Sequence, residues 1–341
     1  MTNKGSTYIK EQRYYYLLLA VGIVCAVLVF VVSLCLGNYQ TTPTDVLFAL
    51  THPEADPQIY MIVTRSRLPR LLAAVLVGAS LSVAGLTYQD IFSNRMASPD
   101  LLGVSAGAGV GASISIYLGF SFWVTGVFAF IGGIAAVCLT VGAAKLFEGT
   151  NRSVASLILA GIVVGGLMNS MLGLFKYLSN DSQLASITFW LLGGFYNTTY
   201  HQLAVAAPLI VLGIAILFLF RWNIVMLRSG DSDAYTHGIN ARLLRRTCIV
   251  TTTIITSVSI CISGTIGWIG LAIPNLVRLL VHNDGRKLMP LAIVYGILFT
   301  EICDLLARTI TNTEIPVGVI TGFIGAVMFI GVLLFQSRRS K

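Results

Sequence analysis

The chain has 341 residues, of which 56% are hydrophobic and 11% are charged, and its formal net charge is +8. A soluble domain carries about 25% charged residues, so this composition excludes a soluble globular protein, a disordered chain and a disulfide scaffold. Because a membrane-spanning helix needs about 20 apolar residues, the sequence predicts an all-α polytopic membrane protein with about ten transmembrane helices.

Ten apolar segments follow one another along the chain, separated by polar residues, glycine or proline. The first, from Leu17 to Leu36, is too long for the core of a signal peptide and is expected to stay as a span. The longest connections are residues 38–66, a predicted polar external loop, and residues 221–246, a strongly basic loop. The expected segments are 15–36, 68–90, 99–118, 122–146, 153–178, 186–220 (a broken segment and then a span), 243–264, 266–282, 289–310 and 316–336.

The distribution of Lys and Arg residues tests this topology, because membrane proteins keep an excess of them in cytoplasmic loops. With the N-terminus inside and ten spans, 17 of the 22 Lys and Arg residues lie on the cytoplasmic side, and both termini are cytoplasmic. Topology therefore accounts for the positive charge, and no nucleic-acid partner is expected. The remaining basic residues are external: Arg65, Arg67, Arg70, Lys176 and Arg308.

The charged residues near the expected outer side have two interpretations. Arg67 and Arg70 lie where the external loop enters the second span, while Glu301, Asp304 and Arg308 belong to the ninth. Asp304 and Arg308 are one helical turn apart and can pair, whereas Glu301 lies about 10 Å deeper than Arg308 by helical rise. Intramembrane carboxylates usually face the bundle interior. The group forms either an internal salt-bridge network or a docking surface that offers arginines to the acidic residues of a partner.

The basic inner loop contains the pattern of a short helix. A possible N-cap, Ser229, precedes Gly230 and Asp231, and the pattern ends near Gly238. We expect this helix to lie across the cytoplasmic face. It is either an ordinary amphipathic connection or a surface that fits a cleft on a cytoplasmic protein.

Other motifs narrow the choice of chemistry. The stretch around Ser105 matches G-x-S-x-G, a nucleophile motif that needs a strand-to-helix turn and a histidine in reach, so a membrane serine hydrolase stands only as a third alternative. Glycines four residues apart, such as Gly161 and Gly165, indicate close helix packing in lipid. No cluster has metal-ligand spacing. No G-x-x-x-x-G-K-[ST] phosphate loop occurs, so uphill transport would need an ion gradient or a separate ATPase.

Several blocks of the sequence, taken together, resemble one family. In chain order they are residues 67–70 with the span 78–89, 98–109, 159–161, 190–194, the loop 230–240, 264–275 with Arg278, 304–308 and 314–318. Their order over nearly the whole chain resembles the FecCD-like permease subunits of type II ATP-binding-cassette (ABC) importers, which carry iron siderophores, haem or cobalamin.

The resemblance implies that residues 1–341 form a single permease domain with ten spans, in a bacterial plasma membrane. Two permease subunits, identical or different, would surround a central pathway. Two cytoplasmic ATPase subunits would bind ATP and Mg²⁺, and a solute-binding protein would dock outside. The chain itself would bind no cofactor or metal and catalyse no reaction, and its substrate would be an iron chelate, foremost a ferric siderophore.

The resemblance also assigns residues to the two faces. Arg67, Arg70 and Arg308 would receive acidic residues of the binding protein. Residues 221–246 would be the cytoplasmic coupling loop that meets the ATPase. Its contact residues would be Gly230, Asp231, Ala234, His237 and Gly238.

The chain departs from the family pattern in three places. Residues 93–97 read Ser-Asn-Arg-Met-Ala where the family usually has Arg-Asn-Pro-Leu-Ala, and Asn275 stands in place of a histidine. Residues 283–286 read Asn-Asp-Gly-Arg in place of an Asp-His-Arg pattern. Because these positions lie near the inner side or in a turn, they affect details of gating more than the fold. They also suit a non-identical partner permease.

Two alternatives remain at this stage. Haem or cobalamin could replace the siderophore as the substrate of the same kind of permease. From another class, an ion-coupled secondary transporter could use Glu301 and Asp304 as an intramembrane charge network that relays protons or cations.

Overall fold

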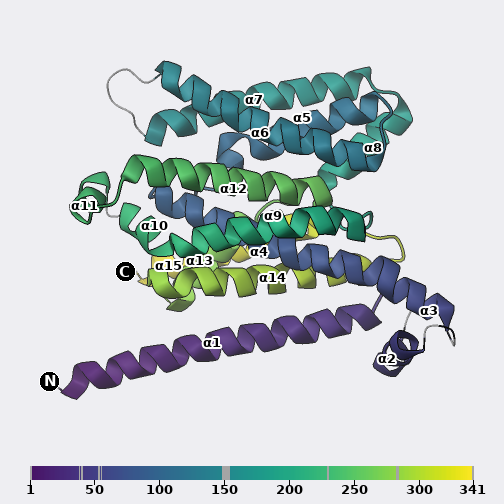
Figure 1. Cartoon of the computed structure of the whole chain (residues 1–341), viewed down its shortest axis with the longest axis horizontal. Helices are drawn as coiled ribbons and strands as arrows, with labels where there is room; N and C mark the ends of the chain where they lie inside the picture. Colours follow the sequence, from purple (N-terminus) through teal and green to yellow (C-terminus); the bar gives the residue numbers. More distant parts are fainter. Residues whose placement is uncertain are drawn as a thin grey trace.

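The computed structural model of the chain describes residues 2–37, 39, 41–52, 54, 56–147, 154–228, 230–281 and 284–339. Within these ranges every regular element is a helix (Figure 1). In chain order they are α1 (Thr2–Cys35), α2 (Pro43–Thr51), α3 (Pro57–Met61), the π-helical turn η1 (Ile62–Arg67), α4 (Leu68–Ile91), the 3₁₀ turn η2 (Pro99–Leu102), α5 (Val104–Tyr117), α6 (Phe122–Phe147), α7 (Val154–Leu178), α8 (Asp181–Leu192), α9 (Tyr200–Leu219), α10 (Arg221–Leu227), α11 (Asp231–Thr236), α12 (Ala241–Ser263), α13 (Ile269–Val281), α14 (Gly285–Thr309) and α15 (Val317–Arg339).

All ten predicted apolar segments contain a helix, which confirms the all-α membrane fold. In the described residues, eight helices are long and apolar enough to cross a membrane. The other two segments hold α5, with 14 residues, and α13, with 13. The broken segment expected before the sixth span is α8, which ends at Gly193 before α9 begins.

The predicted external loop 38–66 is itself largely helical where it is described. Thr42 and Asp45 form a capping box at the start of α2, and the Asp56 side chain accepts a hydrogen bond from the backbone of α3. Pro43 and Pro57 each occupy a first helical position, which suits proline because no backbone hydrogen bond is lost there. The polar residues and prolines that mark the connection in the sequence thus begin its two helices.

The ends of the bundle agree with the assignment made from charge. Figure 1 shows both chain termini and α11 at one end of the helices, and α2 and α3 at the opposite end. The sequence analysis placed the termini and the basic loop together on one side and residues 38–66 on the other. The arrangement of the chain is therefore the one that an even number of crossings requires.

Helix α4 forms the centre of the packing. Nearly all of its residues are buried, and it contacts α9, α12, α13 and α14. A Cβ atom at Gly85 would collide with the carbonyl oxygen of Gly270 on α13, and one at Gly78 would collide with that of Gly296 on α14. Small residues thus let the backbones approach closely, as they do between helices in lipid.

The glycine stripes singled out in the sequence pack as predicted at several positions. Cβ atoms at Gly107 and Gly111 would collide with backbone carbonyls of α6, and one at Gly161 would collide with the carbonyl of Leu101. The expected partner position Gly165, in contrast, has open space around it. Close packing is therefore a property of particular glycines and not of every G-x-x-x-G step.

The replacement Gly85→Ala is expected to destabilise the protein by about 1–3 kcal/mol or more, because the added methyl forces α4 and α13 apart. Gly142→Ala in α6 is the matched control, since nothing lies within 4 Å of a Cβ there. It should leave stability unchanged or raise it by up to about 1 kcal/mol. Thermal unfolding of the two purified variants in detergent measures the difference, and equal melting temperatures would contradict the packing described for α4.

Candidate functional site

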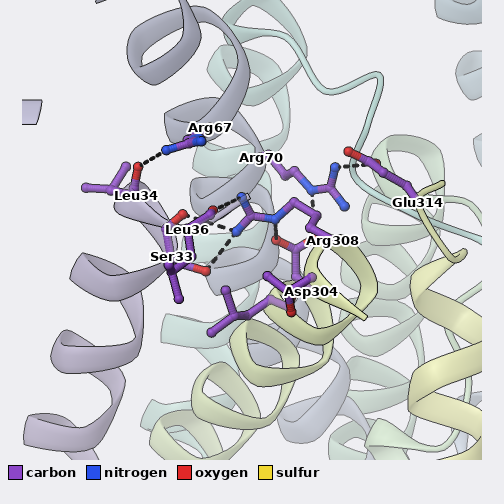
Figure 2. A network of polar contacts seen from close by, with 10 residues as sticks. Ser33, Leu34, Leu36, Arg67, Arg70, Asp304, Arg308 and Glu314 are labelled. Atoms are coloured by element: carbon purple, nitrogen blue, oxygen red, sulfur yellow. Dashed lines mark hydrogen bonds and ion pairs between the residues drawn. The ribbon is translucent and has the colours of Figure 1, made fainter. Parts of the chain in front are cut away.

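An ion-pair network joins the start of α4 to the end of α14 (Figure 2). Arg70 donates from Nε to Asp304 Oδ1 at 2.7 Å and from Nη1 to Glu314 Oε2 at 2.7 Å. Arg308 Nε lies 3.1 Å from Asp304 Oδ2, so the predicted pair one turn apart is confirmed. One carboxylate with no exposed surface therefore holds two guanidinium groups.

Arg308 and a third arginine, Arg67, bind the last turn of α1 and the residue that follows it. Arg67 donates from Nη1 to the carbonyl oxygens of Leu34 at 2.6 Å and Cys35 at 2.9 Å. Arg308 donates to Leu36 O at 3.2 Å and to Ser33 Oγ at 2.8 Å. The last carbonyls of a helix have no partner within the helix, and cations are favourable at that end. The arginines therefore attach a helix that is otherwise mostly exposed.

The predicted docking arginines do come together, but they face their own chain. Arg67, Arg70 and Arg308 are each 5% exposed, and each guanidinium has partners inside the protein. The internal network, one of the two interpretations of these residues, is present in this state, while docking stays a prediction. Arg65 on η1 is an exposed neighbour of this group.

The sequence analysis missed several members of the network. Glu314 and Ser33 lie far from their partners along the chain, so no helical spacing marks them. Glu301, predicted to accompany Asp304, is 1% exposed, and its Oε2 has no hydrogen-bond partner among the described residues. Asp304 Oδ2 likewise has no hydrogen-bond partner among the described residues, but it lies at ion-pair distance from Arg308, whereas no ion pair is found for Glu301 among those residues.

At the opposite end, the predicted short helix is present as α11. Gly230 precedes it with φ 114°, and Gly238 follows it with φ 74°, a left-handed conformation that glycine adopts without strain. Ala234 is fully buried, His237 is exposed, and Tyr235, which the sequence analysis missed, is 74% exposed. Ser229 and the side chain of Asp231 lie outside the described residues. The helix thus presents a protruding tyrosine while a small alanine seats it on the bundle.

Two of the departures from the family pattern contact each other. The Asn275 side chain donates from Nδ2 to the carbonyl oxygen of Arg95 at 3.0 Å and to that of Leu271 at 2.8 Å. The substituted stretch 93–97 and the substituted position in α13 therefore form one local contact. Asn283, in the third departure, lies outside the described residues.

Two open pockets lie among the described residues near the predicted site motifs. One of about 190 Å³ is lined by Asp100, Ser105, Thr256 and Trp268 among others, and the other, of about 540 Å³, lies by α8 with Gln183 and Trp190 in its walls. Ser105 donates its hydroxyl hydrogen to Asp100, a carboxylate and not the histidine base that a serine hydrolase needs. No group of three or more metal-binding side chains occurs among the residues described. The pockets therefore offer mixed apolar and hydroxyl walls.

Comparisons with known proteins cover nearly the whole chain. The model of the FecCD transport family matches residues 25–335. A Helicobacter pylori protein named as an iron chelatin transport system permease is 34% identical over 324 residues, which are 93% of this chain and 98% of that protein. A molybdate import permease of Haemophilus influenzae is 33% identical over 322 residues, covering 92% and 94% of the two chains. Further relatives carry names for hemin and vitamin B12 transport.

A solved structure shows the same arrangement of helices. It is titled as an inward-facing conformation of a metal-chelate type ABC transporter, and it superposes with a TM-score of 0.83 at 31% identity. The match covers 93% of this chain and 98% of that one. Fold and sequence thus point to the same group of proteins.

The replacement Arg70→Met is expected to lower the stability by about 3–5 kcal/mol, because it leaves buried Asp304 with half of its pairing and Glu314 without this partner. Arg65→Met is the matched control on the preceding exposed turn and should change stability by no more than about 0.5 kcal/mol. Thermal unfolding in detergent compares the two. Similar melting temperatures for both variants would show that the network does not hold this end of the bundle together.

Proposed function

The chain belongs to the FecCD transport family, and we propose that within this family it is the permease subunit that passes a ferric chelate, foremost a ferric siderophore, into a bacterial cytoplasm. Members of the family are permease subunits of ABC importers and perform transport without changing a bond in the substrate. The identity of the substrate is the part of the proposal that goes beyond the family.

The observation that carries the proposal is the match over the whole chain to proteins of metal-chelate transport. The iron chelatin permease of Helicobacter pylori and the metal-chelate type transporter each cover 93% of this chain. Relatives of similar identity are named for molybdate, hemin and vitamin B12, so the substrate experiment below includes these three compounds.

The proposed assembly places partner subunits beside the bundle and at its two ends. A second permease subunit, identical or different, completes the pathway, and two cytoplasmic ATPase subunits supply the energy, since the sequence has no phosphate loop of its own. ATP and Mg²⁺ are held by these partners. The exposed α11, at the same end as both termini, would meet the ATPase, and the bacterial plasma membrane is the proposed location.

Docking of a solute-binding protein is proposed for the opposite end. Arg67, Arg70 and Arg308 are committed to internal partners, so an incoming carboxylate would have to share or replace a bond that they already make. Exposed Arg65 needs no such exchange. We therefore extend the proposed docking group to Arg65, with the three buried arginines behind it.

The ion-coupled alternative depends on Glu301 and Asp304. Asp304 accepts a hydrogen bond from Arg70 and forms an ion pair with Arg308, so both of its oxygens face guanidinium groups of the same chain. A relay residue must take up and release its proton or cation. The contacts of Asp304 therefore favour a structural role over a relay.

Uptake by the reconstituted complex tests the proposal. The chain is assembled in liposomes with an ATPase and a solute-binding protein that co-purify with it, and ferric siderophore, hemin, cobalamin and molybdate are offered in turn. ATP-dependent uptake of the ferric siderophore is expected, with none when the ATPase lacks its catalytic residues. Uptake of another compound in its place would overturn the substrate, and uptake by the permease alone under an ion gradient would overturn the family mechanism.

The replacement Arg65→Glu is expected to weaken binding of the solute-binding protein by about fivefold, the effect of about 1 kcal/mol at an exposed charge. The loss should lie mainly in the association rate and shrink at high salt. Lys145→Glu, at the inner end of α6, makes the same charge change as a control. Binding kinetics to the protein in nanodiscs measure both, and equal affinities for the two variants would remove Arg65 from the docking group.

A further inference from the structure

A second buried charge cluster lies at the inner end of α4, and the proposed transport function gives it no role so far. Asp90, in the last turn of α4, accepts a hydrogen bond at Oδ1 from Arg278 Nη2 at 2.7 Å. Arg228, which follows α10, has its Nε 3.6 Å from the same oxygen. Arg278 also donates from Nε to Gln89 at 3.4 Å. One carboxylate thus binds guanidinium groups from two different elements.

The end of α4 attracts positive charge for a second reason. A helix carries partial negative charge at its C-terminus, where its last carbonyls lack partners. Arg245 of α12 donates from Nε to the carbonyl oxygen of Ile91 at 3.2 Å. Side chains from α12, α13 and the residue after α10 therefore converge on one helix end.

The two arginines that face Asp90 are held unequally. The Arg278 side chain is 3% exposed and makes a short bond, whereas the Arg228 side chain is 24% exposed and lies at ion-pair distance. Burial lowers the pKa of the Arg228 guanidinium, and the positive charges of Arg278 and Arg95 add to this effect, while Asp90 opposes it. Arg278 is a fixed partner of Asp90, and Arg228 is the one that can be released at low cost.

Arg228 also lies next to the segment proposed to meet the ATPase. It stands two residues before Gly230, the glycine with φ 114° that precedes α11. The short helix contacts α10 and α12, with Ala234 as its buried residue. A displacement of α11 therefore acts on Arg228 through a connection of two residues, in addition to its direct contact with α12.

Building on the proposed function, we infer that Asp90 is a two-state anchor: it holds Arg278 throughout the transport cycle and holds Arg228 only in the state seen here. Release of Arg228 when α11 moves changes the charge balance at the inner end of α4. Asp90 lies 20 residues from Arg70, or about 30 Å by helical rise, so α4 links this anchor to the outer arginine network. Arg228 is thus a positioning residue for coupling. Its contact with Asp90 is either made or broken, and movements at either end of α4 can shift the balance between these two states.

The test measures substrate molecules imported for each ATP hydrolysed by the complete complex in liposomes. Arg228→Met removes the charge and keeps an unbranched apolar stem. The variant should still assemble with the ATPase and keep its melting temperature. The number of substrate molecules imported per ATP should fall by about tenfold, which is within the usual range of coupling between two sites. Arg228→Lys keeps the charge and should recover most of the ratio. Arg246→Met, an exposed arginine of α12, is the control that should leave the ratio unchanged.

Each outcome has a distinct meaning. A wild-type complex without ATP-driven uptake would refute the proposed function and, with it, the anchor that builds on that function. An unchanged ratio for Arg228→Met in a working complex would refute the anchor alone. Failure of both Arg228→Met and Arg228→Gln to assemble would also refute it, because a releasable contact must tolerate removal. Arg278→Met, by comparison, is expected to lower the melting temperature, since that arginine is the fixed partner.

Discussion

The close burial of α4 is the constraint on which the rest of the structure depends. Gly78 and Gly85 bring this helix into backbone contact with α14 and α13, so neither neighbour can move far without moving α4. Each end of α4 also carries a buried ion cluster, around Asp304 at its start and around Asp90 at its last turn. A helix packed in this way behaves as a rigid element, and small shifts at one end reach the other. Transport between two faces needs an element of this kind.

The lipid environment explains why the cations around Asp304 are arginines. In a membrane, every polar backbone group must find a partner within the protein, and the last turn of α1 ends beside the bundle with free carbonyls. Arg67 and Arg308 supply donors to these carbonyls, and Asp304 balances the charge that they bring. The same guanidinium groups are the ones that the family resemblance assigns to docking. Docking through these arginines would therefore have to compete with their structural role for one set of hydrogen bonds.

Sequence patterns predicted the features that depend on local spacing. The ten apolar segments follow from hydropathy, the pair of Asp304 and Arg308 from helical spacing, and the short helix before Gly238 from residues typical of helix ends. The structure contains each of them. Features that depend on tertiary contacts were not predictable. Glu314 meets Arg70 across 244 residues, and Arg278 meets Asp90 across 188. The burial of the three arginines and the exposure of Tyr235 likewise depend on which helices surround them.

The central claim is that this chain joins events at its two faces through α4. The most direct test is the rate of ATP hydrolysis by the assembled complex in liposomes, measured with and without loaded binding protein at the opposite face. The account predicts that the loaded binding protein clearly raises the rate of hydrolysis above the rate measured without it. No such rise is expected when the partner ATPase is inactive. Hydrolysis that is indifferent to the binding protein would contradict the claim.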